Sequence, residues 1–422
     1  MSKKNMLSGA STGEVNSEDS LSMADKLKKT PVRTSGIGSL TSDAITGVTD
    51  IVESVHKAAL SLPVFLGGTK QDHTKGFTGV VYQNIRAITE FMGDGIDVLI
   101  DQFSSEANKK CSSSGQSVAL AVLNGVLGDH LVKKSNPLAI KMCFRRDGLP
   151  LDEPALAKLI KKSKGKIAIM LHGSCMNDLQ WLRNGHDHGS AIKQDLGFEP
   201  IYLYYNTGRH ISENGREFSE LLEKLIHLSD QPLNIVMLAH SMGGLVARSA
   251  CYYSKELNHI WLKQLRKLIL LGTPHHGAHL EKAGNWVDII LETNPYSSPF
   301  SRLGKIRSSG VTDLRFGSVL DDDWQGLDRF KLSGDKRVPI PLPEGVECYA
   351  MAATAGNSSN VLNDGLIGDG LVTVDSALGR HKKAEFNLAF PLEHQWIGRN
   401  MSHLSLLDHP EVYKTLKGWL RA

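Results

Sequence analysis

The hydrophobic pattern changes twice along the 422 residues of the chain. Residues 1–40 combine Ser, Thr, Gly and Lys with few large apolar side chains, a composition typical of disordered or loosely attached segments. From residue 41 to about 132, apolar residues recur every three or four positions, as on one face of a helix. After Pro137 short apolar runs take over. The pattern therefore predicts a polar segment at 1–40, a helical region at 41–135 and a further domain at 136–422.

The helical region is expected to contain three amphipathic helices. Their apolar positions begin near residue 41, resume after Gly76, and end with a stretch from residue 118 to about 131. Helices of this kind pack on the rest of the chain, form an oligomer interface or lie on a membrane surface, and packing on the chain is the commonest of the three. Peripheral membrane contact stays open as an alternative. Glycines predict kinks or breaks in the second and third helices, at positions 93, 95, 125 and 128.

Beyond residue 136, apolar runs of strand length alternate with amphipathic helical stretches. This alternation predicts an α/β fold with a mostly parallel central sheet, helices on both faces, and ligands at the carboxyl ends of the strands. The alternation is lost over about residues 274–345, an insertion of the size of a cap or lid. The expected strands are residues 138–145, 149–151, 166–171, 201–205, 233–239, 268–271 and 346–350, and the expected helices are residues 153–164, 212–228, 244–253 and 411–420.

A serine between a strand and a helix points to chemistry. Residues 234–244 read Asn-Ile-Val-Met-Leu-Ala-His-Ser-Met-Gly-Gly, so an apolar run leads directly to Ser241. Small residues two positions before and after such a serine allow the sharp turn of a nucleophile elbow, usually written G-x-S-x-G. Here Ala239 takes the first glycine position and Gly243 the second. Ser241 is therefore the candidate nucleophile, although the pattern alone also arises by chance.

A serine hydroxyl needs a base, a carboxylate to orient that base, and donors for the oxyanion. The turn His172-Gly173-Ser174 follows the expected strand at 166–171, and its glycine allows the backbone N–H of Ser174 to be exposed. With the N–H of Met242, the residue after the nucleophile, it would form an oxyanion hole.

The candidate acid and base lie late in the chain. Asp369 stands between two glycines, which free its backbone to place the carboxylate at a strand end. His403 precedes the last expected helix, as the order Ser, Asp, His of this architecture requires. The alternatives nearby are Asp364 and Asp375 for the acid, and His394 and His409 for the base.

Composition narrows the functional classes. Hydrophobic residues make up 41% of the chain, charged residues 22%, and the formal net charge is +3, so neither a membrane bundle nor a nucleic-acid partner is expected. The five cysteines are widely spaced and contain no C-x-x-C pair, and the acidic run at 321–323 lacks the alternation of a calcium loop, so no disulfide framework and no metal site are expected. The first residues lack the apolar core of a secretory signal, which predicts a cytoplasmic location.

Six segments of the 136–422 domain form an ordered set of motifs. They are Leu-His-Gly at 171–173, Tyr-Asn-Thr-Gly-Arg-His-Ile-Ser at 205–212, the elbow at 239–244, Gly-Thr-Pro-His-His-Gly at 272–277, Gly-Asp-Gly-Leu-Val at 368–372, and His403 with Pro-Glu-Val-Tyr at 410–413. In this order they resemble the lipase and esterase branch of the α/β-hydrolases, which includes GPI-inositol-deacylase-like bacterial serine hydrolases. The resemblance covers about residues 138–422.

The resemblance implies an α/β-hydrolase fold with Ser241 as nucleophile, Asp369 as acid and His403 as base. It also implies backbone donors at Ser174 and Met242. His172 and Gly173 would then contact the substrate beside the oxyanion, and His275 and His276 would border the acyl pocket below the cap.

The expected activity is hydrolysis of carboxylic esters through an acyl-enzyme intermediate, without a metal or an organic cofactor. Apolar residues in the 274–345 insertion favour a lipophilic acyl group, so the expected partner is a small-molecule or lipid ester. A thioesterase or amidase with the same triad is one alternative, because the elbow does not reveal the leaving group. A non-catalytic scaffold or binding protein that retains the hydrolase fold is another.

Overall fold

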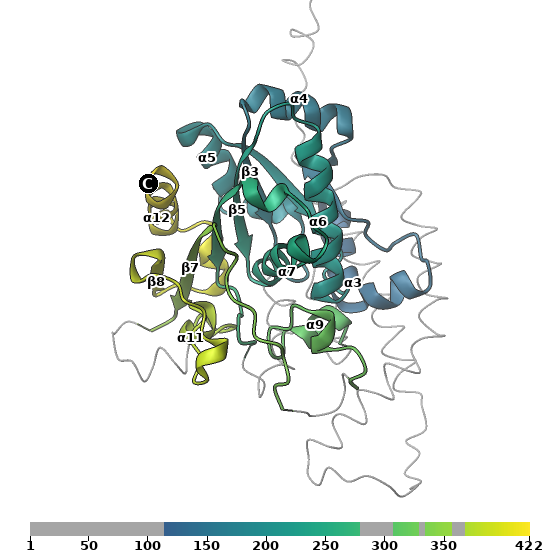
Figure 1. Ribbon diagram of the computed structural model, residues 1–422, viewed down its shortest axis with the longest axis vertical. Coiled ribbons are helices and arrows are strands. Elements are labelled where there is room, and N and C mark those ends of the chain that lie inside the picture. Colours follow the sequence, from purple (N-terminus) through teal and green to yellow (C-terminus); the bar gives the residue numbers. More distant parts are fainter. Residues whose placement is uncertain (1–113, 279–306, 329–333, 357–367) are drawn as a thin grey trace, which may run out of the picture.

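A computed structural model describes residues 114–278, 307–328, 334–356 and 368–422 of the chain (Figure 1). The polar segment expected at 1–40 and the first two of the expected helices lie outside these residues. So does much of the insertion expected at 274–345, together with the alternative acid Asp364.

An eight-stranded sheet forms the centre of the domain, in the order β2-β1-β4-β3-β5-β6-β7-β8. The pairs β3–β4, β3–β5, β5–β6, β6–β7 and β7–β8 are parallel, whereas β1 pairs antiparallel with β2 and β4. The mostly parallel sheet predicted from the sequence is confirmed. The strands are β1 (Cys143–Arg146), β2 (Leu149–Pro150), β3 (Lys166–Leu171), β4 (Glu199–Tyr204), β5 (Asn234–His240), β6 (Leu265–Leu271), β7 (Glu347–Thr354) and β8 (Gln395–Arg399).

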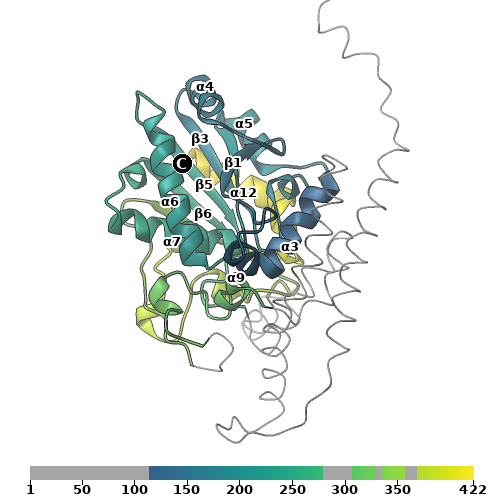
Figure 2. The same cartoon turned by 90° about the vertical axis from the view of Figure 1, so that its right-hand side faces the viewer.

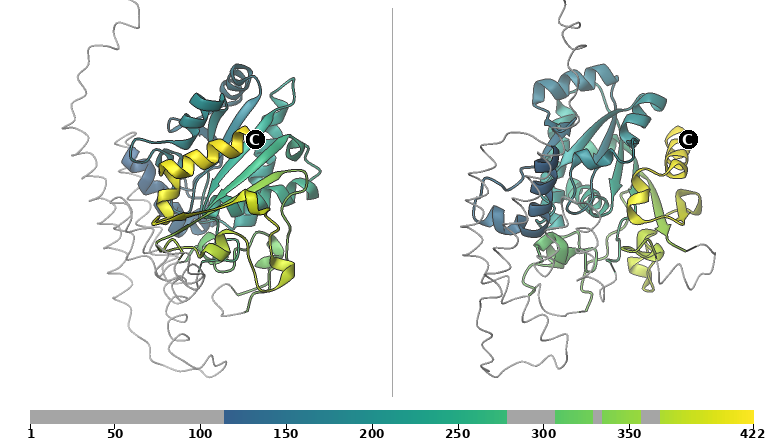
Figure 3. Two further views of the ribbon diagram at one scale, coloured as in Figure 1. Left: turned by 90° about the vertical axis from the view of Figure 1, so that its left-hand side faces the viewer. Right: turned by 180° about the vertical axis from the view of Figure 1, so that it is seen from behind.

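Helices cover both faces of the sheet. Side chains of α3, α4, α6 and α7 share one hydrophobic core with one face, and side chains of α5 and α12 share a second core with the other. Figure 3 shows α12 lying across its face of the sheet. The longer helices are α3 (Ser114–Lys133), α4 (Glu153–Ser163), α5 (His188–Leu196), α6 (Ile211–His227), α7 (Met242–Glu256) and α12 (Pro410–Arg421), and the shorter ones are α9 (Ser309–Asp313) and α11 (Val374–Ala377).

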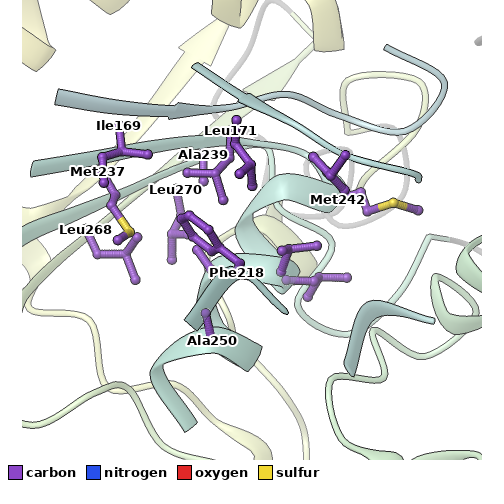
Figure 4. Close-up of a cluster of buried hydrophobic side chains, with 14 of the residues drawn as sticks. Ile169, Leu171, Phe218, Met237, Ala239, Met242, Ala250, Leu268 and Leu270 are labelled. Atoms are coloured by element: carbon purple, nitrogen blue, oxygen red, sulfur yellow. The ribbon is translucent and has the colours of Figure 1, made fainter. Parts of the chain in front are cut away.

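Alternate residues of the central strands point to opposite cores, as the two-residue period of a strand requires. Ile169 and Leu171 of β3 face the first core, while Ala168 and Met170 face the second. Because both faces are buried, the parallel strands read as continuous apolar runs rather than alternating ones. Figure 4 shows the first core, where Phe218 of α6 packs beside side chains of β3, β5 and β6.

Strand β8 and helix α5 are among the elements that the sequence-based prediction missed. Strand β8 is at the edge of the sheet and reads Gln-Trp-Ile-Gly-Arg, with only Gly398 buried, so it lacks the apolar run of the central strands. Helix α5 is short, contains Gly189, and buries the aliphatic side chain of only Ile192. Both elements are defined by their neighbours more than by their own hydrophobic pattern.

The third expected helix of the N-terminal region is α3, which continues through the glycines at 125 and 128. It packs in the same core as the sheet and lies beside α9 (Figure 2). Among the described residues, no helix combines the length and apolar character needed to cross a membrane.

Candidate active site

Ser241 occupies the sharp turn between β5 and α7. Its backbone has φ 54° and ψ −123°, a conformation rare for a residue with a side chain. The turn is held because the Ser241 N–H donates to Leu271 O at 2.8 Å. A Cβ on Gly243 would lie 2.6 Å from the carbonyl oxygen of His172, so glycine is needed for α7 to approach the sheet. Such strain concentrates at functional sites and is typical of a nucleophile elbow.

The turn after β3 lies against this elbow. A Cβ on Gly173 would lie 3.2 Å from the Cβ of Ser241, so the two backbones meet without an intervening side chain. The two residues after Ser174 use their backbone N–H groups to hold the turn. The N–H of Cys175 donates to Thr207 Oγ1 at 3.1 Å, and the N–H of Met176 donates to Gly173 O at 3.3 Å. Met242 is the first residue of α7, where the helix provides no intrahelical partner for an N–H.

Asp369 and His403 are joined by a buried hydrogen bond of 2.6 Å between Oδ2 and Nδ1. The other carboxylate oxygen accepts from the N–H of Leu371 at 2.9 Å and of Val372 at 2.8 Å. Gly368, with φ 50°, and Gly370, with φ 94°, provide the left-handed backbone that folds this loop around the carboxylate. Since an ionised carboxylate only accepts, Nδ1 of His403 carries the proton and Nε2 carries the lone pair.

The alternative acid and the two alternative bases within the described residues lie away from Ser241 or make other contacts. Asp375 is exposed on α11 and pairs with Arg380 at 3.7 Å. His394 bonds the carbonyl of Cys348 at 3.1 Å, and His409 caps the exposed start of α12. Of the described candidates, only Asp369 and His403 meet.

A cavity of about 190 Å³ contains Ser241 and His403 in its lining. Oγ of Ser241 and Nε2 of His403 are both buried and have no hydrogen-bond partner among the described residues. Nδ1 of His240, which also belongs to the lining, is a third buried atom without a partner among the described residues. Such a group of unsatisfied atoms is unusual, because buried polar atoms are normally paired. The remaining lining residues are Gly173, Ser174, Cys175, Met176, Gln180, Leu182, Arg183, His240, Leu371, Leu404 and Leu407.

Two further buried histidines flank the elbow. The ring of His240 lies 4.7 Å from that of His403, and its Nε2–H donates to the His403 carbonyl at 3.3 Å. Burial holds the pKa of His240 well below its usual range, and burial also lowers the pKa of His172 to about 4. Both rings are therefore neutral near pH 7 and add no positive charge next to His403. His172 stacks on Tyr205 and does not line the cavity, whereas Gly173 does.

His275 and His276 do not border this cavity, in contrast to the expectation from the resemblance. They line a separate, smaller cavity with Arg248 and Arg337. His275 is fully buried there, and its Nδ1 lies 3.3 Å from the Arg248 guanidinium.

The 205–212 motif and the acidic run both have structural roles. Asn206 caps its own turn and donates to the Gly128 carbonyl of α3 at 3.1 Å, and neither it nor its neighbours line the cavity with Ser241. Asp323 accepts hydrogen bonds from Val319, Leu320 and Val338, so it organises the insertion. No cluster of metal-ligating side chains occurs in the described parts of the chain.

Sequence reasoning missed most of the cavity wall. Leu182 and Arg183 follow the short helix η2 (Asp178–Trp181), and Leu404 and Leu407 belong to the short helix η9 (His403–Leu407). Leu182 is 65% exposed although it is apolar, and the Arg183 guanidinium pairs with Asp408 at 3.1 Å. The only signal in the sequence was that Leu404 and Leu407 lie within four residues of the candidate base His403.

The mostly parallel sheet and the elbow between β5 and α7 give the described domain an α/β-hydrolase fold. Residues 162–340, which are fewer than half of the chain, match the sequence profile of a family described as the PGAP1-like alpha/beta domain. The matched segment includes Ser241 and ends before Asp369 and His403. No curated protein sequence matches the chain.

Several solved structures are similar in fold. The mature Bacillus licheniformis lipase BlEst2 is 15% identical, with 66% of this chain and 98% of that chain covered and a TM-score of 0.41. Aspergillus fumigatus lipase B is 9% identical, with coverages of 64% and 53% and a TM-score of 0.38. A type II thioesterase of the yersiniabactin biosynthetic pathway is 14% identical, with coverages of 61% and 92% and a TM-score of 0.35. At these values the likenesses do not bear on activity or substrate.

Proposed function

We propose that the chain is a serine hydrolase that cleaves carboxylic esters with Ser241, His403 and Asp369 as its catalytic triad. The main support is the pair of unsatisfied atoms in one cavity. Oγ of Ser241 has a proton to donate and Nε2 of His403 has a lone pair to accept it, while Asp369 holds the opposite side of the ring at 2.6 Å.

In the proposed reaction, Oγ of Ser241 attacks the ester carbonyl while Nε2 of His403 takes its proton. The backbone N–H groups of Ser174 and Met242 stabilise the oxyanion of the tetrahedral intermediate. As the intermediate collapses, the C–O bond to the alcohol breaks and His403 returns the proton to the leaving oxygen. Water then attacks the acyl-enzyme by the same route, which releases the acid and restores Ser241.

The cavity favours a lipophilic acyl group. Its side-chain lining includes Met176, Leu182, Leu371, Leu404 and Leu407. Burial of apolar surface contributes about 0.8 kcal/mol per methylene group, so acyl chains that reach these residues should bind better than acetate. The proposed substrate is therefore a small-molecule or lipid ester with an apolar acyl chain.

A fluorophosphonate probe tests the nucleophile. Folded wild-type protein should be labelled at Ser241, and Ser241→Ala should abolish the labelling. His403→Ala should slow it strongly, because the base is gone, whereas His409→Ala, at an exposed helix cap, should label like the wild type. A wild-type protein that is folded but not labelled would favour the non-catalytic scaffold.

Matched substrates test the leaving group. Oxygen esters, thioesters and anilides of the same acyl chain should be compared by kcat/KM on the same preparation. The oxygen ester should be cleaved at a rate at least comparable with the thioester, and the anilide should be much slower. Cleavage of the thioester or the anilide without cleavage of any oxygen ester would reassign the enzyme to one of those classes.

A further inference from the structure

The oxyanion turn after β3 is held from outside the PGAP1-like segment by helix α3. Residues 162–340 match the family profile, and α3 ends at residue 133, before that segment begins. The helix nevertheless lies directly behind the turn. An ideal Cβ on Gly125 of α3 would lie 2.3 Å from Sγ and 3.0 Å from Cα of Cys175. The bare backbone of α3 is thus in contact with the residue that follows Ser174.

Cys175 has an unfavourable backbone conformation that needs outside support. Its φ is 58°, in the left-handed region that residues with a side chain rarely adopt. The N–H of Cys175 is anchored on Thr207 Oγ1 at 3.1 Å, and its other side rests on Gly125. Because Cys175 and Ser174 share a peptide bond, any shift of Cys175 moves the backbone around Ser174.

Further contacts fix α3 in this position. Asn177, just after the turn, donates from Nδ2 to Ser117 Oγ of α3 at 3.2 Å. On the other side, Ser308 of the insertion donates from Oγ to the carbonyl of Gly125 at 2.7 Å. Gly125 is therefore held between the oxyanion turn and the insertion.

We propose that α3 is a positioning element for the oxyanion hole and that Gly125 is the residue through which it acts. This inference rests on the proposed ester hydrolysis. Glycine inside a helix costs roughly 0.5–1 kcal/mol relative to alanine, so helix formation alone would favour a side chain here. The close approach to Cys175 explains why none is present.

The test is a double-mutant cycle. Gly125→Ala adds a methyl group against Cys175 and should displace the turn. Cys175→Gly removes the side chain that would collide, and glycine suits the positive φ at this position. The double variant should therefore recover most of what Gly125→Ala loses. Gly418→Ala is the matched control, because it adds the same methyl group within α12 where no atom lies within 4 Å.

For Gly125→Ala we expect kcat to fall by roughly 10²-fold, the loss typical of an impaired oxyanion donor, with KM changed by less than about twofold. Inhibition by a trifluoromethyl ketone, which forms a tetrahedral adduct, should weaken by a similar factor. Gly418→Ala should match the wild type in both measurements. An unchanged kcat in folded Gly125→Ala, or a double variant no better than the single one, would overturn the proposal.

A readout independent of activity separates this inference from the proposed function. The backbone amide resonances of Ser174 and Cys175 should shift in Gly125→Ala and return towards their wild-type positions in the double variant. If these shifts occur in a protein that cleaves no ester, α3 positions the turn but the proposed function fails. If Gly125→Ala does not fold, Ser117→Ala removes the contact to Asn177 instead, and a kcat unchanged from the wild type would refute the positioning role.

Discussion

The carboxylate of Asp369 binds His403 with one oxygen and its own loop with the other. Oδ2 lies 2.6 Å from Nδ1 of His403, and Oδ1 accepts from the N–H groups of Leu371 and Val372. The His403 N–H in turn approaches the Asp369 carbonyl at 3.3 Å, so backbone and side chain both join the two residues. The carboxylate cannot turn without breaking these three hydrogen bonds, and the His403 ring cannot turn without breaking its bond to Oδ2. The ring of His403 is thereby held with Nε2 directed away from the acid.

Asp369→Asn should reduce kcat by about 10⁴-fold with little effect on folding, because an amide can donate to Nδ1 and thereby favour the wrong tautomer of His403. Asp375→Asn is the matched control, since this exposed carboxylate pairs only with Arg380 in the described structure. Steady-state hydrolysis of a 4-nitrophenyl ester measures both. Equal activity of the two variants would remove Asp369 from the triad.

Leu182→Ala should lower kcat/KM for a hexanoate ester roughly tenfold and that for an acetate ester much less. Leu182 is 65% exposed, lines the cavity and belongs to neither hydrophobic core of the described residues. Loss of its contact with the end of an acyl chain removes on the order of one to two methylene equivalents of burial. Leu392→Ala, at a residue 81% exposed and outside the cavity lining, should leave both values unchanged. A uniform loss for both esters would indicate a general structural effect.

Protein stability should fall between pH 7 and pH 5, in part through His188. Burial lowers the pKa of this histidine to about 4, and its Nε2–H donates to the carbonyl of Leu406 at 3.0 Å while Nδ1 faces His186 at 2.7 Å. Because the folded pKa lies below the unfolded value of about 6.5, the unfolded chain takes up the proton first as pH falls. The contribution of His188 to the free energy of unfolding is therefore fully present above about pH 6.5 and declines as the pH falls towards 4.

His188→Gln should flatten this dependence. The wild type is expected to lose about 2 kcal/mol more than the variant between pH 7 and pH 5, as measured by urea unfolding. Between pH 7 and pH 8.5 both proteins should show the same dependence, because the imidazole is neutral in either state. Identical slopes below pH 6.5 would mean that His188 is not the responsible group.

The central strands and the elbow were predictable because their physics is local. Residues 167–171 form a continuous apolar run that is buried on both faces, and β3 has the predicted bounds 166–171. Ser241 was recognisable because the turn requires small residues at fixed positions on both sides. The choice of His403 over His394 and His409 depended on the motif, since all three lie in similar polar segments.

The cavity wall was not predictable in this way. Leu182 and Leu407 lie more than 200 residues apart in the sequence but line the same cavity. The pair Arg183–Asp408 and the hydrogen bond from His188 to the η9 backbone join their segments. The second cavity, which His275 lines with Arg248 and Arg337, likewise combines residues from distant parts of the chain, which no local pattern encodes.

Helix α3 should be indispensable for folding of the hydrolase domain. It buries its apolar residues in the core shared with the sheet, and the Asn124 side chain bonds the backbone of Leu138 and Ile140 at 2.9 Å. Each buried Val or Leu contributes roughly 1.5–3 kcal/mol, so loss of several exceeds much of the 5–15 kcal/mol that stabilises a typical domain. The buried apolar residues are Val118, Ala121, Val122, Leu123, Val126, Leu127 and Leu131.

Two truncated chains test this expectation, one beginning at residue 108 and the other at residue 136. The longer chain retains α3 and should show a cooperative unfolding transition, whereas the shorter one should show none and should remain largely insoluble. The two differ by α3 and its flanks alone, so upstream residues do not affect the comparison. A chain from residue 136 that unfolds cooperatively and cleaves esters at the rate of the longer one would show that α3 is dispensable, and it would also contradict the positioning role assigned to Gly125.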